Sequence, residues 1–344
     1  MKKVVASGGK AMLADHTLPE VSPAEIQVRV LYSTISAGTE LGILTASANN
    51  SGAQFNLGYQ AVGRIEVCGA DMARAFAPGE IVACYGAPYV FHARSLNVPR
   101  HLAAKVPQSL ANDSASLCQT AFCGLGTIAL HGFRCGCLSL GETAAVIGLG
   151  VLGNLVAQAA AAAGCRVAAC DTIDTRRHAA RECGITACAS LEELRALVMD
   201  DSSGHGADTV YLAVNKADDS LVTDAISLLR DRGRMVIVGT TAASLPRESM
   251  FNKEASIIVS RAGGPGRYDE QYEAAGHDYP YAHARWTEGR NLEEYVRLLA
   301  QGRMRIAPLV TDVVPVSGAG HVYDDIRDNP ARHIGVVMDW SREP

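Results

Sequence analysis

The sequence contains no pair of cysteines spaced as C-x-x-C, and the nearest approach is Cys135-Gly136-Cys137. This absence removes the usual signature of a zinc ribbon. The start of the chain has no apolar stretch of signal-peptide length, so its 10 cysteines are expected to be reduced thiols of a cytoplasmic protein. The alanine-rich stretch 155–163 is too short to span a bilayer.

Runs of basic residues are also absent. The net charge of −5 is spread along the chain, which argues against nucleic-acid binding. Because 48% of the residues are hydrophobic and 19% are charged, the chain can build a sizeable core. Its 344 residues are enough for two domains.

Two patterns divide the chain. Apolar and polar residues alternate at 26–30, and strand patterns continue at 58–67 and 79–83, so the first hundred residues are predicted to be β-rich. From residue 143, short apolar runs alternate with helical stretches, which is typical of a doubly wound parallel sheet. Strands are predicted at 143–147, 166–170, 208–214, 234–238 and 256–259, and helices at 154–163, 175–182, 191–199 and 219–230.

After residue 260 the pattern becomes irregular. A helix is predicted at 291–301, and late strands at 308–314 and 333–338 are expected to return to the first domain. We therefore expect an α/β protein with a β-rich domain of residues 1–116 and 262–344 and a doubly wound domain of residues 117–261.

A glycine motif, G-x-G-x-x-G, lies between the strand at 143–147 and the following helix. Its first glycine, Gly148, suits a tight turn, and Gly150 leaves room for backbone to approach a pyrophosphate. Gly153 allows the helix to pack against the sheet, so that the N–H groups of Val151 and Leu152 face an anion. This context predicts a bound dinucleotide rather than a turn that only packs a helix.

Asp171 follows the second strand at the spacing where an acid meets the ribose hydroxyls. Its carboxylate would repel a 2′-phosphate, which favours NAD, while Arg176 close behind keeps NADP open. Val214 and Gly239, after two later strands, are further expected cofactor contacts.

Four segments of the chain are short motifs: ISAGTEL at 35–41, GYQAVG at 58–63, FAPGEIV at 76–82 and GADTV at 206–210. They resemble the C-G-T-D-L, G-H-E-x-x-G, F-x-P-G-D-x-V and G-A-D-x-V motifs of the medium-chain dehydrogenase/reductase superfamily, which contains zinc alcohol dehydrogenases and quinone reductases. The resemblance covers nearly the whole chain and implies a GroES-like catalytic domain, a Rossmann domain and a homodimer.

The zinc ligands of that superfamily are missing. Its catalytic zinc uses a Cys of the first motif, a His with an adjacent Glu of the second, and a Cys of the linker helix. Ala37, Tyr59 and Gln60 stand at these places, and only Cys123 falls near the last one. Alanine cannot bind a metal and a neutral tyrosine is a poor zinc ligand, so no metal is expected.

Four further segments narrow the resemblance: IALHGFR at 128–134, GPGRYD at 264–269, DYP at 278–280 and RWTE at 285–288. They resemble the dehydrogenase half of bacterial bi-domain oxidoreductases, which tend to be linked to saccharide metabolism. The resemblance implies a sugar, glycoside or polyol substrate, and a separate sugar-dehydrogenase-like partner in place of the second half.

Without zinc, a general base and hydrogen-bond donors must handle the substrate proton. Tyr59 in the vacated histidine place either exchanges this proton or only fills the empty metal cavity. Thr39 matches the relay hydroxyl of the superfamily, and Glu40 is either an acid at the same corner or an ion-pair partner that fixes the loop. His92 is a further catalytic candidate, with a structural role as the alternative.

A segment rich in aromatic and charged residues, 261–290, offers stacking faces and hydrogen bonds that a sugar site needs. Its alternative roles are a dimer contact or a lid without substrate contact. The candidate substrate-binding residues are Gln60, Arg267, Tyr268, His277, Tyr279, Arg285 and Trp286.

These features predict a metal-free, NAD-dependent dehydrogenase that acts on a secondary hydroxyl of a sugar, glycoside or cyclitol. One alternative is a quinone or enoyl reductase of the same superfamily, which Asp171 opposes because such enzymes usually prefer NADPH. The other is a non-catalytic NAD-binding partner protein, which would bind the cofactor without turnover.

Overall fold

The computed structural model describes residues 1–50, 52–242, 244 and 246–342. The chain forms two compact units. Unit 1 comprises residues 1–127, 265–301 and 309–344, and unit 2 comprises residues 128–264 and 302–308. The first boundary falls within helix α4 (Cys123–Cys135), whereas the domain boundaries expected from the sequence lie at 116/117 and 261/262.

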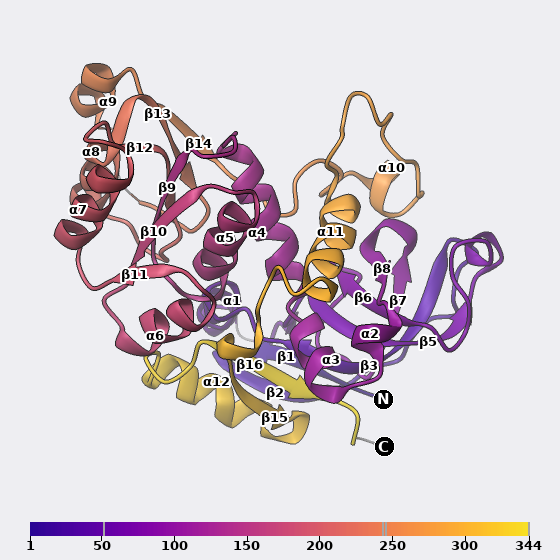
Figure 1. Ribbon diagram of the computed structural model, residues 1–344. Coiled ribbons are helices and arrows are strands. Elements are labelled where there is room, and N and C mark those ends of the chain that lie inside the picture. Colours follow the sequence, from indigo (N-terminus) through magenta and orange to yellow (C-terminus); the bar gives the residue numbers. More distant parts are fainter. Residues whose placement is uncertain (51, 243, 245, 343–344) are drawn as a thin grey trace. The chain divides into compact units, whose positions relative to one another are not determined.

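Unit 1 is built on a mixed sheet in the order β15-β16-β3-β5-β6-β8, with β7 also paired to β3 (Figure 1). The alternation at 26–30 buries Ile26, Val28 and Val30 in its core. The late strands return to this sheet as predicted, because β16 pairs antiparallel with β3. The strands are β3 (Glu25–Thr34), β5 (Gln60–Cys68), β6 (Ile81–Tyr85), β7 (Ser95–Pro99), β8 (Ala103–Lys105), β15 (Val310–Pro315) and β16 (Gly335–Asp339).

A smaller antiparallel sheet in the order β2-β1-β4 completes the β structure of unit 1. Its strands are β1 (Lys2–Ser7), β2 (Lys10–Asp15) and β4 (Phe55–Asn56). The helices of the unit are α1 (Ala37–Ala48), α2 (Gln108–Ala111), α3 (Ser114–Thr120), α10 (Glu270–Glu273), α11 (Glu288–Ala300) and α12 (Ala319–Asp328). Single 3-10 turns are η1 (Ala70–Met72), η2 (Arg100–Leu102), η3 (Ala307–Leu309) and η4 (Val316–Gly318).

Helix α1 lies in a region that the sequence predicts to be β-rich, and it was not predicted. Its buried residues are Glu40, Leu44 and Ser47, which are spaced by four and three and so share one face. Two of these three are polar, and the helix also contains Gly38 and Thr39. The apolar periodicity and the helix propensity that reveal a helix are therefore both weak here.

Unit 2 contains a wholly parallel sheet in the order β11-β10-β9-β12-β13-β14. Its strands are β9 (Thr143–Ile147), β10 (Arg166–Cys170), β11 (Thr186–Cys188), β12 (Ala207–Leu212), β13 (Leu229–Ile237) and β14 (Ser256–Val259). The helices are α5 (Val151–Ala162), α6 (Asp174–Glu182), α7 (Leu191–Asp201), α8 (Asp219–Ser227) and α9 (Arg247–Lys253). Alternating strands and helices with this order form the predicted Rossmann arrangement.

One predicted boundary in unit 2 is wrong. The helix predicted at 219–230 ends at Ser227, and β13 begins at Leu229. Leu229 is fully buried and pairs with Ala207 of β12. The burial of Leu229 in the sheet therefore outweighs the helical pattern that the sequence continues to residue 230. In the described ranges, no helix combines the length and low polarity of a membrane-spanning segment.

Candidate functional site

The glycine turn of unit 2 has the backbone geometry that its sequence requires. Gly148 has φ +94°, and a Cβ there would lie 2.8 Å from the carbonyl oxygen of Ala213. A Cβ on Gly153 would overlap the carbonyl oxygen of Gly148. A Cβ on Gly150, in contrast, would meet no atom within 4 Å. Protein atoms therefore leave no room for a side chain at Gly148 or Gly153, whereas the space beside Gly150 is empty.

The open side of this turn is the beginning of helix α5. Gly150 is the N-cap residue, and no side chain caps the helix in the described part of the chain. Free N–H groups at a helix N-terminus attract an anion. Residues Val151 and Leu152, which the sequence predicts to face a pyrophosphate, form this first turn. The residues present fit a dinucleotide.

Asp171 lies directly after β10 and is held beside the glycine turn. Its Oδ2 accepts a hydrogen bond from the N–H of Leu149 at 2.8 Å, and its Oδ1 accepts one from Ile173 at 2.9 Å. Arg176 Nη1 lies 3.6 Å from Oδ2. Each carboxylate oxygen has a second lone pair, so Asp171 can still accept from ribose hydroxyls.

Val214 and Gly239 lie at the same edge of the parallel sheet, after β12 and β13. A Cβ on Gly239 would overlap the backbone of Val214, and Val214 Cγ1 lies 2.8 Å from where a Cβ of Gly148 would stand. The structure therefore brings all of the predicted cofactor residues to the carboxyl edge of the sheet, where Rossmann domains bind nucleotides.

In unit 1, Tyr59 stands just before β5 and is half-buried. Its hydroxyl donates to Ser36 Oγ at 2.8 Å, and Ser36 is the N-cap residue of α1. Burial raises the pKa of Tyr59, although the contacts with Ser36 and Thr39 act in the opposite direction. Tyr59 therefore carries its proton at neutral pH and is a hydrogen-bond donor. Thr39 is exposed on the first turn of α1.

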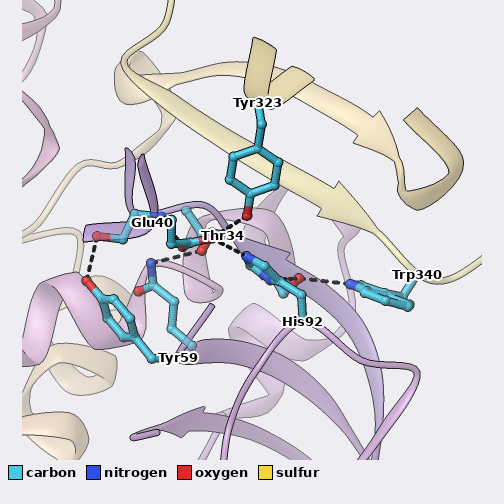
Figure 2. A network of polar contacts seen from close by, with 9 residues as sticks. Thr34, Glu40, Tyr59, His92, Tyr323 and Trp340 are labelled. Atoms are coloured by element: carbon cyan, nitrogen blue, oxygen red, sulfur yellow. Dashed lines mark hydrogen bonds and ion pairs between the residues drawn. The ribbon is translucent and has the colours of Figure 1, made fainter. Parts of the chain in front are cut away.

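Glu40 is fully buried at the centre of a polar network (Figure 2). Its Oε1 accepts from the N–H of Ser36 at 2.7 Å. Its Oε2 lies 3.1 Å from Nε2 of His92 and accepts from the hydroxyl of Tyr323. These contacts fix the N-terminal turn of α1, which also holds the acceptor of the Tyr59 hydroxyl.

His92 is fully buried between Glu40 and Ser33. Its Nδ1 lies 2.8 Å from Ser33 Oγ, which also accepts from Trp340 Nε1 at 2.8 Å. If Ser33 donates its own proton to Nδ1, Nε2 carries the imidazole proton and donates to Glu40. Ser33, Trp340 and Tyr323 could not be predicted from local sequence patterns, because they come from opposite ends of the chain.

The other positions of the superfamily's zinc site are engaged elsewhere. Gln60 Nε2 donates to the carbonyl of Thr34 at 3.2 Å, and its Oε1 accepts from the N–H of Leu125 at 2.9 Å. The buried thiol of Cys123 lies 3.1 Å from the carbonyl oxygen of Cys84. Across the described ranges, no three His, Cys, Asp or Glu side chains form a group that could hold a metal. The residues present do not fit a catalytic zinc.

Arg267 comes from the aromatic and charged segment 261–290, called the late segment from here on, and lies in unit 1. Its guanidinium is buried and donates to Glu273 Oε1 and, at 2.6 Å, to the carbonyl of Ala87. It also stacks on the exposed ring of Tyr268 at 4.0 Å and lies 5.9 Å from the ring centroid of Tyr85. Arg267 is held firmly, while Tyr268 presents its ring to solvent.

Tyr85 links this group to Tyr59 and was not predicted. The two rings meet edge-on with centroids 6.1 Å apart, and Tyr85 pairs with Gln60 across β5 and β6. The predicted residues Tyr59, Gln60, Arg267 and Tyr268 therefore belong to one contact group. All five residues of β6 are apolar and buried, so no alternation in the sequence marks Tyr85.

The remaining candidates of the late segment lie in other contacts. His277 is exposed and bonds Gln271 at 3.1 Å, while Tyr279 stacks on Tyr272 with centroids 5.4 Å apart. Arg285 stacks on Trp286 at 3.8 Å. His277, Tyr279 and Arg285 thus contact residues of segment 261–290.

Glu288 at the start of α11 is a further feature that the sequence did not single out. It is fully buried, and among the described residues neither carboxyl oxygen has a hydrogen-bond partner. Burial and the nearby Glu273 raise its pKa to about 9, although Arg267 acts to lower it. Glu288 therefore retains its proton at neutral pH.

Comparisons with known proteins agree with this fold. The zinc-binding dehydrogenase family matches residues 151–276. The 2-dehydro-3-deoxy-L-galactonate 5-dehydrogenase of Pseudoalteromonas atlantica is 26% identical over 205 residues, which are 59% of this chain. The chain spans about half of that relative, 53% of its length. The D-guloside 3-dehydrogenase of Escherichia coli is 26% identical over 94% of this chain and 95% of its own.

Among solved structures, the galactitol-1-phosphate dehydrogenase of Escherichia coli matches with a TM-score of 0.77. The two are 20% identical, and the match covers 98% of this chain and 100% of that one, which supports the fold. The glycine turn at 148–153 lies at the start of the segment that the family matches. These matches, together with the two-unit fold, support a place in the medium-chain dehydrogenase/reductase superfamily.

Proposed function

We propose that this protein is a metal-independent, NAD-dependent dehydrogenase that oxidises a secondary hydroxyl of a sugar, glycoside or cyclitol, or reduces the matching ketone. The observation that carries the proposal is the hydroxyl of the partly buried Tyr59, which donates a hydrogen bond to Ser36 at the place where the superfamily has a zinc ligand. A protein that only bound a dinucleotide would not need a positioned proton donor here.

Tyr59 is proposed to hold the reacting oxygen of the substrate. Because burial keeps its pKa high, the phenol would stay protonated and donate a hydrogen bond to the alkoxide-like oxygen that develops in either direction of the reaction. The proton of the oxidised hydroxyl would be released to solvent water, and ketone reduction would take it up from there. A bound NAD would supply the hydride acceptor. Thr39 is proposed to contact the same oxygen. Glu40 and His92 are fully buried, so we assign them to positioning of the Ser36 turn rather than to contact with substrate.

NAD is proposed over NADP because of Asp171. Its two oxygens are directed by backbone N–H groups to the edge of the glycine turn, where a 2′-phosphate would meet a carboxylate. Arg176 is already engaged at 3.6 Å by Asp171, which reduces its capacity to attract a phosphate. Metal independence is supported by the donors that are missing at Ala37 and already bonded at Gln60.

A saccharide or polyol is the proposed substrate class. The named activities of the curated relatives concern a galactonate derivative and a guloside. The exposed ring of Tyr268 and the Arg285–Trp286 pair offer the aromatic faces and donors that sugars require. His277 and Tyr279 remain candidates for further contacts with a large substrate.

A homodimer is proposed as well. Strand β14 is the edge of the sheet in unit 2, and Val259 on it is 69% exposed. Phe251 of the neighbouring helix α9 is 73% exposed. An open apolar edge strand favours pairing with a second chain.

The test is NAD reduction with a panel of sugars, glycosides, cyclitols and simple alcohols, with and without a chelator and with NADP in parallel. We expect turnover of a saccharide with NAD that survives chelation. Tyr59→Phe should lower kcat by about 10²–10⁴-fold while NADH binding stays unchanged. Tyr32→Phe, which removes a phenol elsewhere in the sheet, is the matched control. Consumption of NADPH with quinones or enones, and silence on the panel, would favour the reductase instead.

A further inference from the structure

We propose that unit 1 contains a second binding site, separate from the Tyr59 group, for a neutral polyhydroxylated ligand such as a saccharide or polyol. The site is a cavity of about 460 Å³. It lies among η2 and β8, the segment that follows α10, and the first turns of α11. Its volume is in the range of small-molecule sites. None of its lining residues belongs to the network of Figure 2.

One wall of the cavity is a rigid aromatic stack. The ring of Tyr272 lies between His101, with centroids 4.3 Å apart, and Tyr279 at 5.4 Å, and the three planes are nearly parallel. The Tyr272 hydroxyl donates to Thr287 Oγ1 at 2.7 Å. His101 Nε2 bonds the carbonyl of Gly276 at 3.0 Å. These contacts hold the wall in one conformation, which lowers the entropic cost of binding a ligand.

Three of the charged groups that line the cavity are already paired. Arg290 Nη2 lies 2.6 Å from Asp278 Oδ2, and Lys105 Nζ lies 2.7 Å from Glu80 and 5.8 Å from the ring centroid of Phe76. These pairs fix the shape of the cavity and neutralise most of its charge.

Two other charged groups have no such partner. The side chains of Arg100 and Glu293 make no hydrogen bond or ion pair with any residue that the structure describes, yet both line the cavity, where the charges of Arg290 and Arg100 act on Glu293. Arg100 offers N–H donors and Glu293 offers carboxylate acceptors. The cavity therefore presents a free donor group and a free acceptor group beside a rigid aromatic wall.

This combination selects among ligand classes. The carboxylates of Asp278 and Glu293 oppose an anion, while Arg100, Lys105 and Arg290 oppose a cation. An apolar ligand would desolvate these charges without replacing their hydrogen bonds. A sugar or polyol has hydroxyls that donate to Glu293 and accept from Arg100, and C–H faces that pack on aromatic and aliphatic side chains.

The experiment is isothermal titration of the full chain, without NAD, with monosaccharides, methyl glycosides and disaccharides, and with inorganic phosphate as the anionic probe. Arg100→Gln and Glu293→Gln should each weaken binding of a neutral saccharide by about tenfold or more. Both side chains are exposed, so thermal unfolding should not change. Arg74→Gln and Glu20→Gln, which lie outside the cavity, are the matched controls and should bind like the wild type.

Tyr59→Phe separates this site from the proposed reaction, because it should leave this binding unchanged even if turnover is lost. Saccharide binding that disappears with Tyr59→Phe but survives Arg100→Gln would overturn the second site and leave the proposed function intact. Binding of phosphate instead of saccharides, or no saturable saccharide binding, would also overturn it.

Discussion

The protonated Glu288 gives the sharpest physical prediction. It is fully buried at the first turn of α11, and both of its carboxyl oxygens lack a partner among the described residues. Its pKa is about 9 in the folded chain, raised first by burial and then by Glu273, whereas an unfolded glutamate titrates near its ordinary value of 4.5. Glu288→Gln replaces the acid with a neutral group of the same shape.

The size of the effect follows from proton linkage. Between these two pKa values the folded chain keeps a proton that the unfolded chain has released, so the free energy of unfolding falls as pH rises. The loss is up to about 1.4 kcal/mol per pH unit. From pH 6 to pH 8 the wild type should therefore lose about 2.7 kcal/mol that the Glu288→Gln variant keeps, because all other titrating groups are common to both. Below pH 4 both the folded and the unfolded chain hold this proton, so the pH dependence from Glu288 disappears.

Urea unfolding followed by tryptophan fluorescence measures this difference. The chain has two tryptophans, Trp286 and Trp340, and both lie in unit 1 with Glu288, so the signal reports on that unit. The exposed Glu20→Gln is the control and should run parallel to the wild type at every pH. If Glu288→Gln also ran parallel to the wild type between pH 6 and pH 8, the assignment of a buried proton to Glu288 would be refuted.

Three predictions concern the cofactor site and assembly. Gly153→Ala should destabilise unit 2 by about 3 kcal/mol in thermal unfolding, because its Cβ overlaps backbone. Gly150→Ala should fold normally and weaken NADH binding about tenfold in fluorescence titrations. Asp171→Asn should weaken NADH binding by about 10–100-fold and reduce the preference for NADH over NADPH. Asp174→Asn, at an exposed position, is the control and should bind like the wild type. Equal effects of both variants would contradict the proposal that Asp171 binds the ribose hydroxyls. Val259→Lys should convert a dimer to a monomer in sedimentation, and an unchanged mass would exclude the β14 edge.

Much of unit 2 could be predicted because the residues that form its strands and its glycine turn are also the ones that show clear sequence patterns. Short apolar runs mark strands buried on both faces, and the glycines at 148 and 153 are required by backbone contacts within a few residues of themselves or at the next strand. Unit 1 was predicted less completely. Helix α1 buries the polar residues Glu40 and Ser47, so the spacing of its apolar residues does not show a helical period.

The candidate site of unit 1 was predicted in part for a similar reason. The motifs at 35–41 and 58–63 contain Ser36, Glu40 and Tyr59, which the fold brings into contact. The groups that complete the network lie 283 and 307 residues from their partners, as with Tyr323 and Trp340. No local spacing encodes such contacts. The late segment was recognised by composition, but composition does not tell which of its side chains face the cavity beside Tyr272.

The buried network also holds the turn that carries Ser36, the acceptor of the Tyr59 hydroxyl. A zinc ion would organise the loops around it through strong bonds to several side chains. Here a single carboxylate, Glu40, accepts from the backbone of Ser36, from His92 and from Tyr323, which come from three distant parts of the chain. Charge-assisted hydrogen bonds of this kind are strong when buried. Under the proposed function, Glu40 would perform the structural part of a metal's task, and the phenol of Tyr59 would supply the proton donor.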